Sequence, residues 1–200
     1  MKKRNAACSH TPPATTPRPG LLFLALLLLA VGFQVHFALN SAPLYLKVAP
    51  QAQLPYLMPV FWIGFNLLMF PAAAMVKRFG TTETMAFAAA LGGMITLVAT
   101  LPLALDNLVI AQFLAGGSWG AVSVAAYSAA VALGRTGREG RFMGALFAVL
   151  ALAVAVRISA VAAGLVKLPE IGALLPWLPA SAWLTAALLL LGARVSSRRG

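Results

Sequence analysis

The sequence predicts an all-α integral membrane protein with six transmembrane helices and both termini in the cytoplasm. The first observation behind this prediction is composition: 61% of the 200 residues are hydrophobic and only 10% are charged, whereas a soluble domain carries about 25% charged residues. The second is that the apolar residues gather in six runs, each near the roughly 20 residues that cross a hydrocarbon core. The third is that Lys and Arg gather between alternate runs, which argues against a nucleic-acid-binding surface despite a net charge of +11.

The first two spans follow a basic, Pro-rich segment, residues 1–20, which we expect to be a disordered cytoplasmic tail. The first apolar run extends from about Leu21 to Leu39. It is longer than the hydrophobic segment of a secretory signal, about 7–15 residues, so we expect an uncleaved span. The second run, about Leu54 to Val76, contains three prolines, which neighbouring helices make tolerable within a membrane.

The other four spans are separated by short connections, so that consecutive helices must be antiparallel. Their expected ranges are about Thr84 to Leu105, Leu108 to Leu133, Phe142 to Val166 and Leu175 to Leu191. We therefore predict one transmembrane domain over residues 21–193, followed by a basic cytoplasmic tail, residues 194–200.

The orientation follows from the distribution of Lys and Arg between the spans. Twelve of them lie in the N-terminal segment, the loops after spans two and four, and the C-terminal segment, whereas the other two loops carry only Lys47 and Lys167. Positively charged loops stay in the cytoplasm. Both termini are therefore predicted to be cytoplasmic, in a plasma membrane (the inner membrane of a bacterium).

The segment after the second span, A-A-A-M-V-K-R-F-G-T-T, resembles a cytoplasmic signature of the major facilitator superfamily of transporters. Arg78, Phe79 and Gly80 match the family pattern, and Lys77 stands where the family has an acidic residue. The resemblance implies that this segment is a cytoplasmic gating loop.

Two further segments are similar to the same family. In span four, Q-F-L-A-G-G-S-W-G resembles its Arg-x-x-x-Gly-x-x-x-Gly pattern, with Gly116 and Gly120 in place and Gln112 at the usual Arg position. The loop that follows, G-R-T-G-R-E-G-R-F-M-G-A-L, resembles the family's entry into span five, and adds Arg138 and Arg141 to the gating-loop candidates.

The resemblance implies one half of a transporter, because a complete member has twelve spans in two similar halves. We favour the first half. It implies alternating-access transport of a small solute, with the cavity completed by a second copy or by a separate partner half. Lys77 and Gln112 replace charged groups that the family uses in gating and proton coupling, which puts proton-driven transport in question.

Arg157 is the only formal charge well inside a predicted span. An Arg at the centre of a membrane helix costs about 2.5–3.5 kcal/mol on insertion scales. At 1.5 Å per residue it lies roughly 22 Å into span five, past the midplane. We predict that it binds an anionic substrate; the alternative is that it reaches the outer interface or bonds to carbonyl groups.

His36 reaches a similar depth on span one, with Asn40 one turn further on the same face. This histidine would exchange protons near neutral pH, or else serve as a hydrogen-bonded residue near the outer surface. Asn66 in span two and Gln34 in span one line a cavity or, as we favour, form hydrogen bonds between helices.

Span four carries a polar face formed by Gln112, Gly116, Trp119, Ser123 and Tyr127, which follow at steps of four, three, four and four. In the family that this chain resembles, the corresponding helix lines the central cavity. The resemblance thus implies that Trp119 stacks on the substrate and that Ser123 and Tyr127 hydrogen-bond to it. The alternative is helix packing through the Gly116-x-x-x-Gly120 pattern.

The sequence gives less support to other functions. A non-transporting membrane subunit, or the remnant of a truncated transporter, remains the alternative to a transporter. An intramembrane enzyme is disfavoured because the four acidic residues fall at span ends and only His10 and His36 are available as histidines. We expect no cofactor, no metal site and no nucleic-acid partner; the expected partners are the lipid bilayer and a small molecule. The sequence predicts neither the substrate, the direction of transport nor the driving ion.

Overall fold

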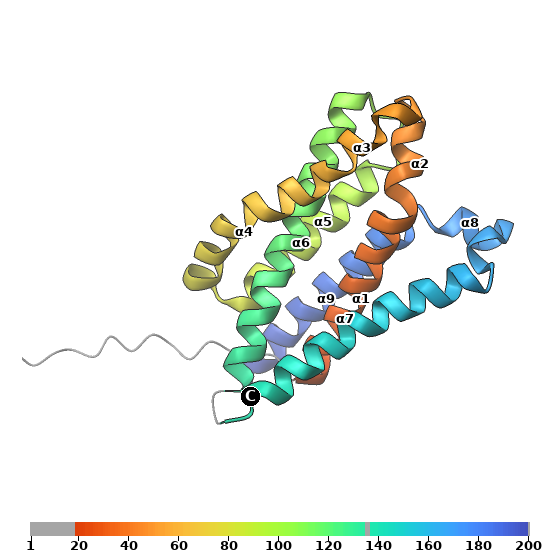
Figure 1. Ribbon diagram of the computed structural model, residues 1–200. Coiled ribbons are helices and arrows are strands. Elements are labelled where there is room, and N and C mark those ends of the chain that lie inside the picture. The colour runs from red at the N-terminus through yellow and green to blue at the C-terminus, as the bar shows by residue number, and fades with distance from the viewer. Residues whose placement is uncertain (1–18, 135–136, 200) are drawn as a thin grey trace, which may run out of the picture.

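The computed structural model describes residues 19–134 and 137–199, and within these residues every regular element is a helix (Figure 1). Five of the helices are long and apolar enough to cross a membrane, and a sixth apolar stretch, Leu178–Ala193, is shorter. The N-terminal tail expected over residues 1–20 lies outside the described residues except for Pro19 and Gly20, which already belong to the first helix.

The first span is longer than the sequence indicated. It joins α1 (Pro19–Val35), a π-helical turn η1 (His36–Asn40) and α2 (Ser41–Leu46) into one continuous helix of 28 residues. Ser41 donates both its backbone N–H and its hydroxyl to the His36 carbonyl, a bond over five residues that defines the wider π turn. Such turns are often found at functional sites.

The second span consists of η2 (Gln51–Gln53), α3 (Leu54–Leu57) and α4 (Pro59–Phe79). Pro55 and Pro59 lie in the first turns of α3 and α4, where proline is favoured because a helix leaves its first N–H groups without an intrahelical partner. The helix runs three residues past the expected end at Val76, because Lys77 and Arg78 occupy its last turn, where cations interact favourably with the helix dipole.

The connection to α5 (Thr81–Val98) is therefore Gly80 alone, with φ of 99°. A side chain is strained at such a positive φ, which explains the glycine. The expectation that Lys77 and Arg78 belong to a loop is wrong: both are helical.

The third and fourth spans meet differently from the sequence prediction. α5 ends at Val98 rather than at Leu105, and α6 (Leu105–Leu133) takes in Leu105 and the acidic Asp106 as its first turn. A carboxylate there faces the positive end of the helix dipole. The residues between Leu105 and Leu108, which we expected to connect two spans, thus belong to α6.

The fifth and sixth spans are also shifted. α7 (Glu139–Ala162) begins with Glu139 and ends before Gly164, which has φ of 72°. Two short helices follow, η3 (Leu165–Lys167) and α8 (Pro169–Leu174), before α9 (Leu178–Arg199). Residues 194–199 continue α9 as helix, so the C-terminal segment expected as a tail is helical there.

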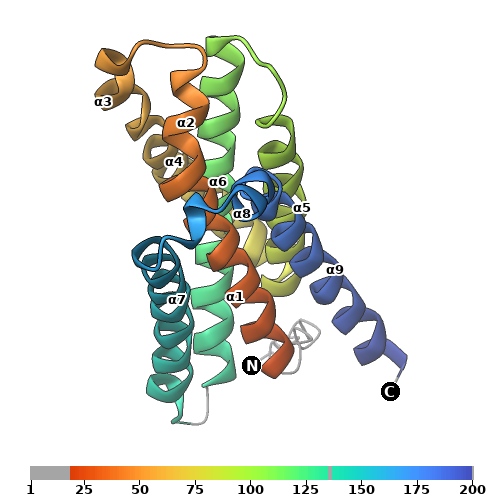
Figure 2. The same cartoon turned by 90° about the vertical axis from the view of Figure 1, so that its right-hand side faces the viewer.

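The turns α4–α5 and α6–α7 lie at one end of the bundle, together with the start of α1 and the end of α9 (Figure 2). We call it the basic end, because Lys77, Arg78, Arg138 and Arg141 lie there. The opposite end carries α2, α3 and α8 (Figures 1 and 2).

The helices pack in a pattern that repeats within the bundle. α4 packs against α6 and α7 against α1, α5 packs against α6 and α9 against α1, and α5 and α9 pack against each other. Exchanging the first three spans with the last three maps the first four of these contacts onto one another and the α5–α9 contact onto itself, whereas the contacts of α6 with α7 and of α4 with α5 have no comparable counterpart. Because the two sets of spans run in opposite directions, the shared contacts are those expected of an inverted repeat.

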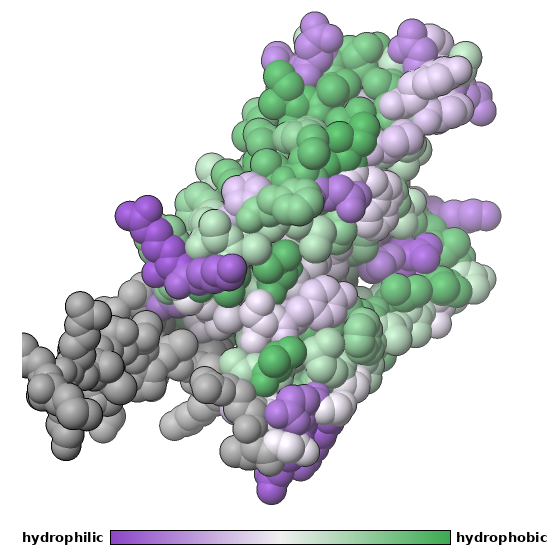
Figure 3. All heavy atoms as spheres, turned by 60° about the vertical axis from the view of Figure 1, so that its left-hand side comes forward, coloured by the Kyte–Doolittle hydropathy of each residue, from purple (hydrophilic) through white to green (hydrophobic). Residues whose placement is uncertain are grey.

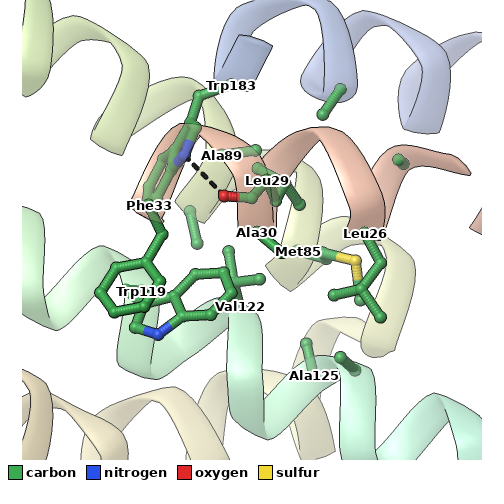
Figure 4. Packing of buried hydrophobic residues seen from close by; sticks show 14 of the residues in the cluster. Leu26, Leu29, Ala30, Phe33, Met85, Ala89, Trp119, Val122, Ala125 and Trp183 are labelled. Atoms are coloured by element: carbon green, nitrogen blue, oxygen red, sulfur yellow. Dashed lines mark hydrogen bonds between the residues drawn. The ribbon is translucent and has the colours of Figure 1, made fainter. Parts of the chain in front are cut away.

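The core lies where α1, α5, α6 and α9 meet (Figure 4). Its largest fully buried side chain, Trp183 of α9, donates its ring N–H to the Leu29 carbonyl at 3.0 Å. Gly32 and Gly92 lie directly against this ring, with no space for a Cβ.

The outer two spans are far less covered than the inner ones. In the most apolar stretch of each helix, 17% of residues are buried for Gln51–Phe79 and 11% for Glu139–Ala162, against 50–67% for the first, third and fourth spans. Apolar residues cover much of the face in Figure 3, with polar groups mainly at its ends and a few near its middle.

Candidate functional site

The fourth span packs its glycines against the second. A Cβ on Gly116 would collide with the Phe61 carbonyl oxygen, and one on Gly120 would come within 2.6 Å of the Phe65 carbonyl oxygen. The backbones of α4 and α6 therefore approach closely along this stripe, the geometry that a small-xxx-small pattern permits.

Trp119, on the same face of α6, belongs to the core. Its ring stacks on Phe33 of α1 with centroids 4.5 Å apart and an interplanar angle of 6°, and the side chain is 7% exposed. The expectation that Trp119 stacks on a substrate does not fit these surroundings, because its face is already covered by protein.

Ser123 and Tyr127 continue this face toward the basic end. Ser123 Oγ donates to the carbonyl of Trp119 at 2.9 Å, within its own helix. Tyr127 is half-buried and its ring contacts Phe147 of α7, with centroids 6.0 Å apart. The donor of the Ser123 hydroxyl is thus used within α6, and its contact with a substrate stays a prediction.

His36 forms an enclosed polar centre at the π-helical turn. Its Nε2 donates to Gln112 Oε1 of α6 at 3.1 Å, since an amide oxygen can only accept. His36 is 3% exposed and Gln112 is 1% exposed. Within the described residues, the buried Nε2 of Gln112 has no acceptor. Sequence reasoning placed Gln112 at a usual Arg position and on the polar face of span four, but it missed the pairing with His36.

Asn40 and His36 line one small cavity near the opposite end, as expected from their shared face. The cavity has a volume of about 80 Å³, and Lys47, Thr96 and Thr100 also line it. Asn40 donates from Nδ2 to the carbonyl of Leu175 at 2.8 Å, which links the first span to the segment before α9.

Arg157 forms the second polar centre, between α7 and α1. Its Nε donates to Gln34 Oε1 at 2.9 Å, and the side chain is partly buried. Its partner is therefore Gln34, although His36 had been expected at the same depth. Because α7 begins at Glu139, Arg157 lies about 27 Å along the helix, nearer the opposite end than the sequence indicated.

No carboxylate balances this guanidinium. All four acidic residues of the chain lie in the first turns of other helices or of α7 itself: Glu83, Asp106, Glu139 and Glu170. Among the described residues, the neutral Gln34 side chain is the polar partner of Arg157. A positive charge at this depth is costly unless an anion accompanies it.

Asn66 faces outward from α4. Its side chain is exposed, and Nδ2 donates to the Trp62 carbonyl of its own helix at 2.7 Å. The favoured expectation, a hydrogen bond between helices, is therefore wrong for Asn66 among the described residues. It is confirmed for Gln34, which accepts a hydrogen bond from Arg157 of α7.

An aromatic cluster joins α1, η1 and α4, and it includes Phe37, three residues after Gln34. Phe33 and Phe37 stack on each other with centroids 5.9 Å apart, and Phe37 meets the edge of Trp62 at 5.2 Å. Trp62 remains 39% exposed. Sequence reasoning missed this cluster, although F-x-x-x-F in span one and F-W in span two indicated it.

The gating-loop candidates stand apart from both polar centres. Lys77, Arg78, Arg138 and Arg141 are exposed at the basic end, and the Arg78 guanidinium lies over the Phe79 ring at 5.2 Å. In residues 19–134 and 137–199 no three His, Cys, Asp or Glu side chains come together in a way that could hold a metal ion.

Comparisons with known proteins add no assignment: no family model, curated protein or solved structure matches the chain.

Proposed function

We propose that this chain is a six-helix half of a plasma-membrane transporter, and that two copies enclose a path along which a small solute crosses by alternating access. The observation that carries the proposal is Arg157, a positive charge inside an apolar helix, whose polar partner among the described residues is the neutral Gln34. Ionisable residues at membrane depth mark substrate or ion paths by default.

The packing pattern supports this proposal. Two sets of three spans related as an inverted repeat are a common plan of secondary transporters, whose substrates bind near the middle of the membrane between repeats. The same plan is implied by the resemblance to the major facilitator superfamily. The poorly covered α4 and α7 are the helices that a second copy would cover.

The orientation in this proposal follows the positive charges. With six spans, the basic end and both termini face the cytoplasm. Lys77 and Arg78 at the end of α4, Gly80 after it, and Arg138 and Arg141 at the start of α7 then lie at the cytoplasmic mouth. Their proposed role is to open and close that mouth as the two bundles rock.

A non-transporting membrane subunit or a truncated remnant is the second candidate. One observation favours it: Trp119 and Ser123, which the resemblance assigns to the substrate path, make contacts within the bundle. A subunit would keep such packing without needing Arg157 for any uptake.

Uptake into proteoliposomes tests the proposal. We would measure the entry of radiolabelled small anions, cations and neutral solutes, with protein-free liposomes as the background. We expect uptake of at least one anion, and a fall to background in Arg157→Gln. Lys167→Gln, which removes an exposed cation after α7, is the matched control and should transport normally. Uptake at background for every solute would favour the subunit.

A further inference from the structure

We propose that the solute is a small monocarboxylate with an aromatic or similarly apolar body, bound between Arg157 and the Trp62–Phe37 pair. The inference rests on the proposed function, because a second bundle is what closes this otherwise open face.

The guanidinium of Arg157 is oriented for a carboxylate. Its Nε is engaged by Gln34 at 2.9 Å, which fixes the plane of the group. The two terminal nitrogens then present parallel N–H donors, and this fork matches the two oxygens of a carboxylate. Gln34 is therefore a positioning residue, and the terminal N–H groups are the binding groups.

The charge of the site selects a monoanion. Arg157 lies within α7, five residues before the helix ends at Ala162, and all four acidic residues of the chain lie in the first turns of helices. One negative charge neutralises the site, whereas a cation would be repelled and a neutral solute would leave the Arg charge unbalanced in an apolar setting.

The apolar body of the solute has a surface beside the fork. Gln34 and Phe37 are three residues apart and emerge on the same side of the first span. The Phe37 ring reaches the edge of Trp62 at 5.2 Å, and Trp62 is 39% exposed. An aromatic ring placed there gains offset or edge contacts. The enclosed Trp119, by contrast, has its face covered by Phe33.

A lipid phosphodiester is also a monoanion, so two sources of the anion must be separated. We commit to a soluble carboxylate, because a lipid headgroup has no aromatic or apolar body that would pack against Trp62 and Phe37. The protein would be reconstituted in nanodiscs of neutral phosphatidylcholine and, in a second arm, with phosphatidylglycerol added. An anionic lipid that displaces the carboxylate completely would assign the site to lipid and overturn the inference.

The probes are benzoate, benzyl alcohol, benzylamine and acetate, with binding measured by calorimetry. We expect benzoate to bind at least about tenfold more tightly than benzyl alcohol, since hydrogen bonds to a charged group are among the strongest, and benzylamine not to bind. Arg157→Gln should abolish the preference for benzoate. Trp62→Leu should weaken benzoate about tenfold and leave acetate unchanged.

Trp177→Leu is the control for the aromatic surface, because Trp177 is exposed and lies in the turn before α9 rather than on α1, α4 or α7. Equal binding of benzoate and benzyl alcohol, or an unchanged preference in Arg157→Gln, would overturn the inference. If Arg157→Gln fails to fold, Gln34→Leu replaces it. An unchanged preference for benzoate over benzyl alcohol in Gln34→Leu would equally overturn the inference.

The inference and the proposed function fail in different ways. Benzoate binding that requires Arg157, without any uptake, would leave the carboxylate site standing and refute the transporter. Uptake of a neutral or cationic solute, without preference for benzoate, would leave the transporter standing and refute the carboxylate site.

Discussion

Two side chains on or against the first span are paired with glutamine, yet they lie in opposite settings. His36 bonds to Gln112 in the interior, where the two side chains are 3% and 1% exposed. Arg157 bonds to Gln34 at the partly open side of α7. The first pair is enclosed by helices and joins α1 to α6. Among the described residues, the second engages only Nε of Arg157, in a helix that is hardly covered. A hydrogen bond to glutamine therefore stabilises helix packing at His36, whereas at Arg157 it orients a side chain that we propose binds a solute.

The comparison extends to the helices around each pair. α6 lies so close to α4 that Gly116 has no space for a Cβ, whereas a Cβ on Gly144 of α7 would meet nothing within 4 Å. The enclosed side should respond to substitutions through stability, and the open side through binding. Three substitutions test this difference.

Gly116→Leu should have the largest effect. The side chain would collide with the Phe61 carbonyl and force α4 away from α6, at a cost of about 3 kcal/mol or more. We expect loss of the monodisperse peak in detergent and a much lower melting temperature by circular dichroism. Gly144→Leu on the open side should melt like the parent protein. Similar melting of the two variants would contradict the comparison.

Gln112→Leu should have an intermediate effect. It removes the acceptor of His36 Nε2 and strands a buried N–H, which costs about 1–3 kcal/mol. Unfolding in mixed micelles of increasing denaturing detergent measures this. The double variant His36→Leu/Gln112→Leu should recover part of the loss, because both polar groups are then removed together. Gln34→Leu is the matched change on the open side and should cost less than Gln112→Leu; the reverse order would break the comparison.

Arg157→Gln should have the smallest effect on stability, less than about 1 kcal/mol, because removing an unbalanced charge from an apolar helix offsets the lost bond to Gln34. The same variant should lose uptake. The unfolding assay and the uptake assay on one preparation check both statements. A large loss of stability would show that Arg157 holds the bundle together and would remove the reason to place it in a substrate path.

The sequence predicted the helical class and the approximate spans, because long apolar runs leave few alternatives. It misplaced helix ends wherever polar residues joined a helix, as Lys77 and Asp106 do. It also placed Arg157 level with His36 but could not tell which residue of span one it meets. Two residues along a helix turn by about 200°, so Gln34 and His36 point to opposite sides, toward α7 and α6 respectively. The π turn at His36–Asn40 further changes the directions in which the following side chains point. The pattern of apolar residues gives no sign of this turn.

The mass of the purified protein in nanodiscs, by native mass spectrometry, tests the central claim most directly. The open side of α7 and α4 predicts a stable homodimer, at twice the chain mass of 20.8 kDa, that keeps its mass on dilution. A strict monomer over the same range would contradict the proposal that two copies of this chain enclose the transport path.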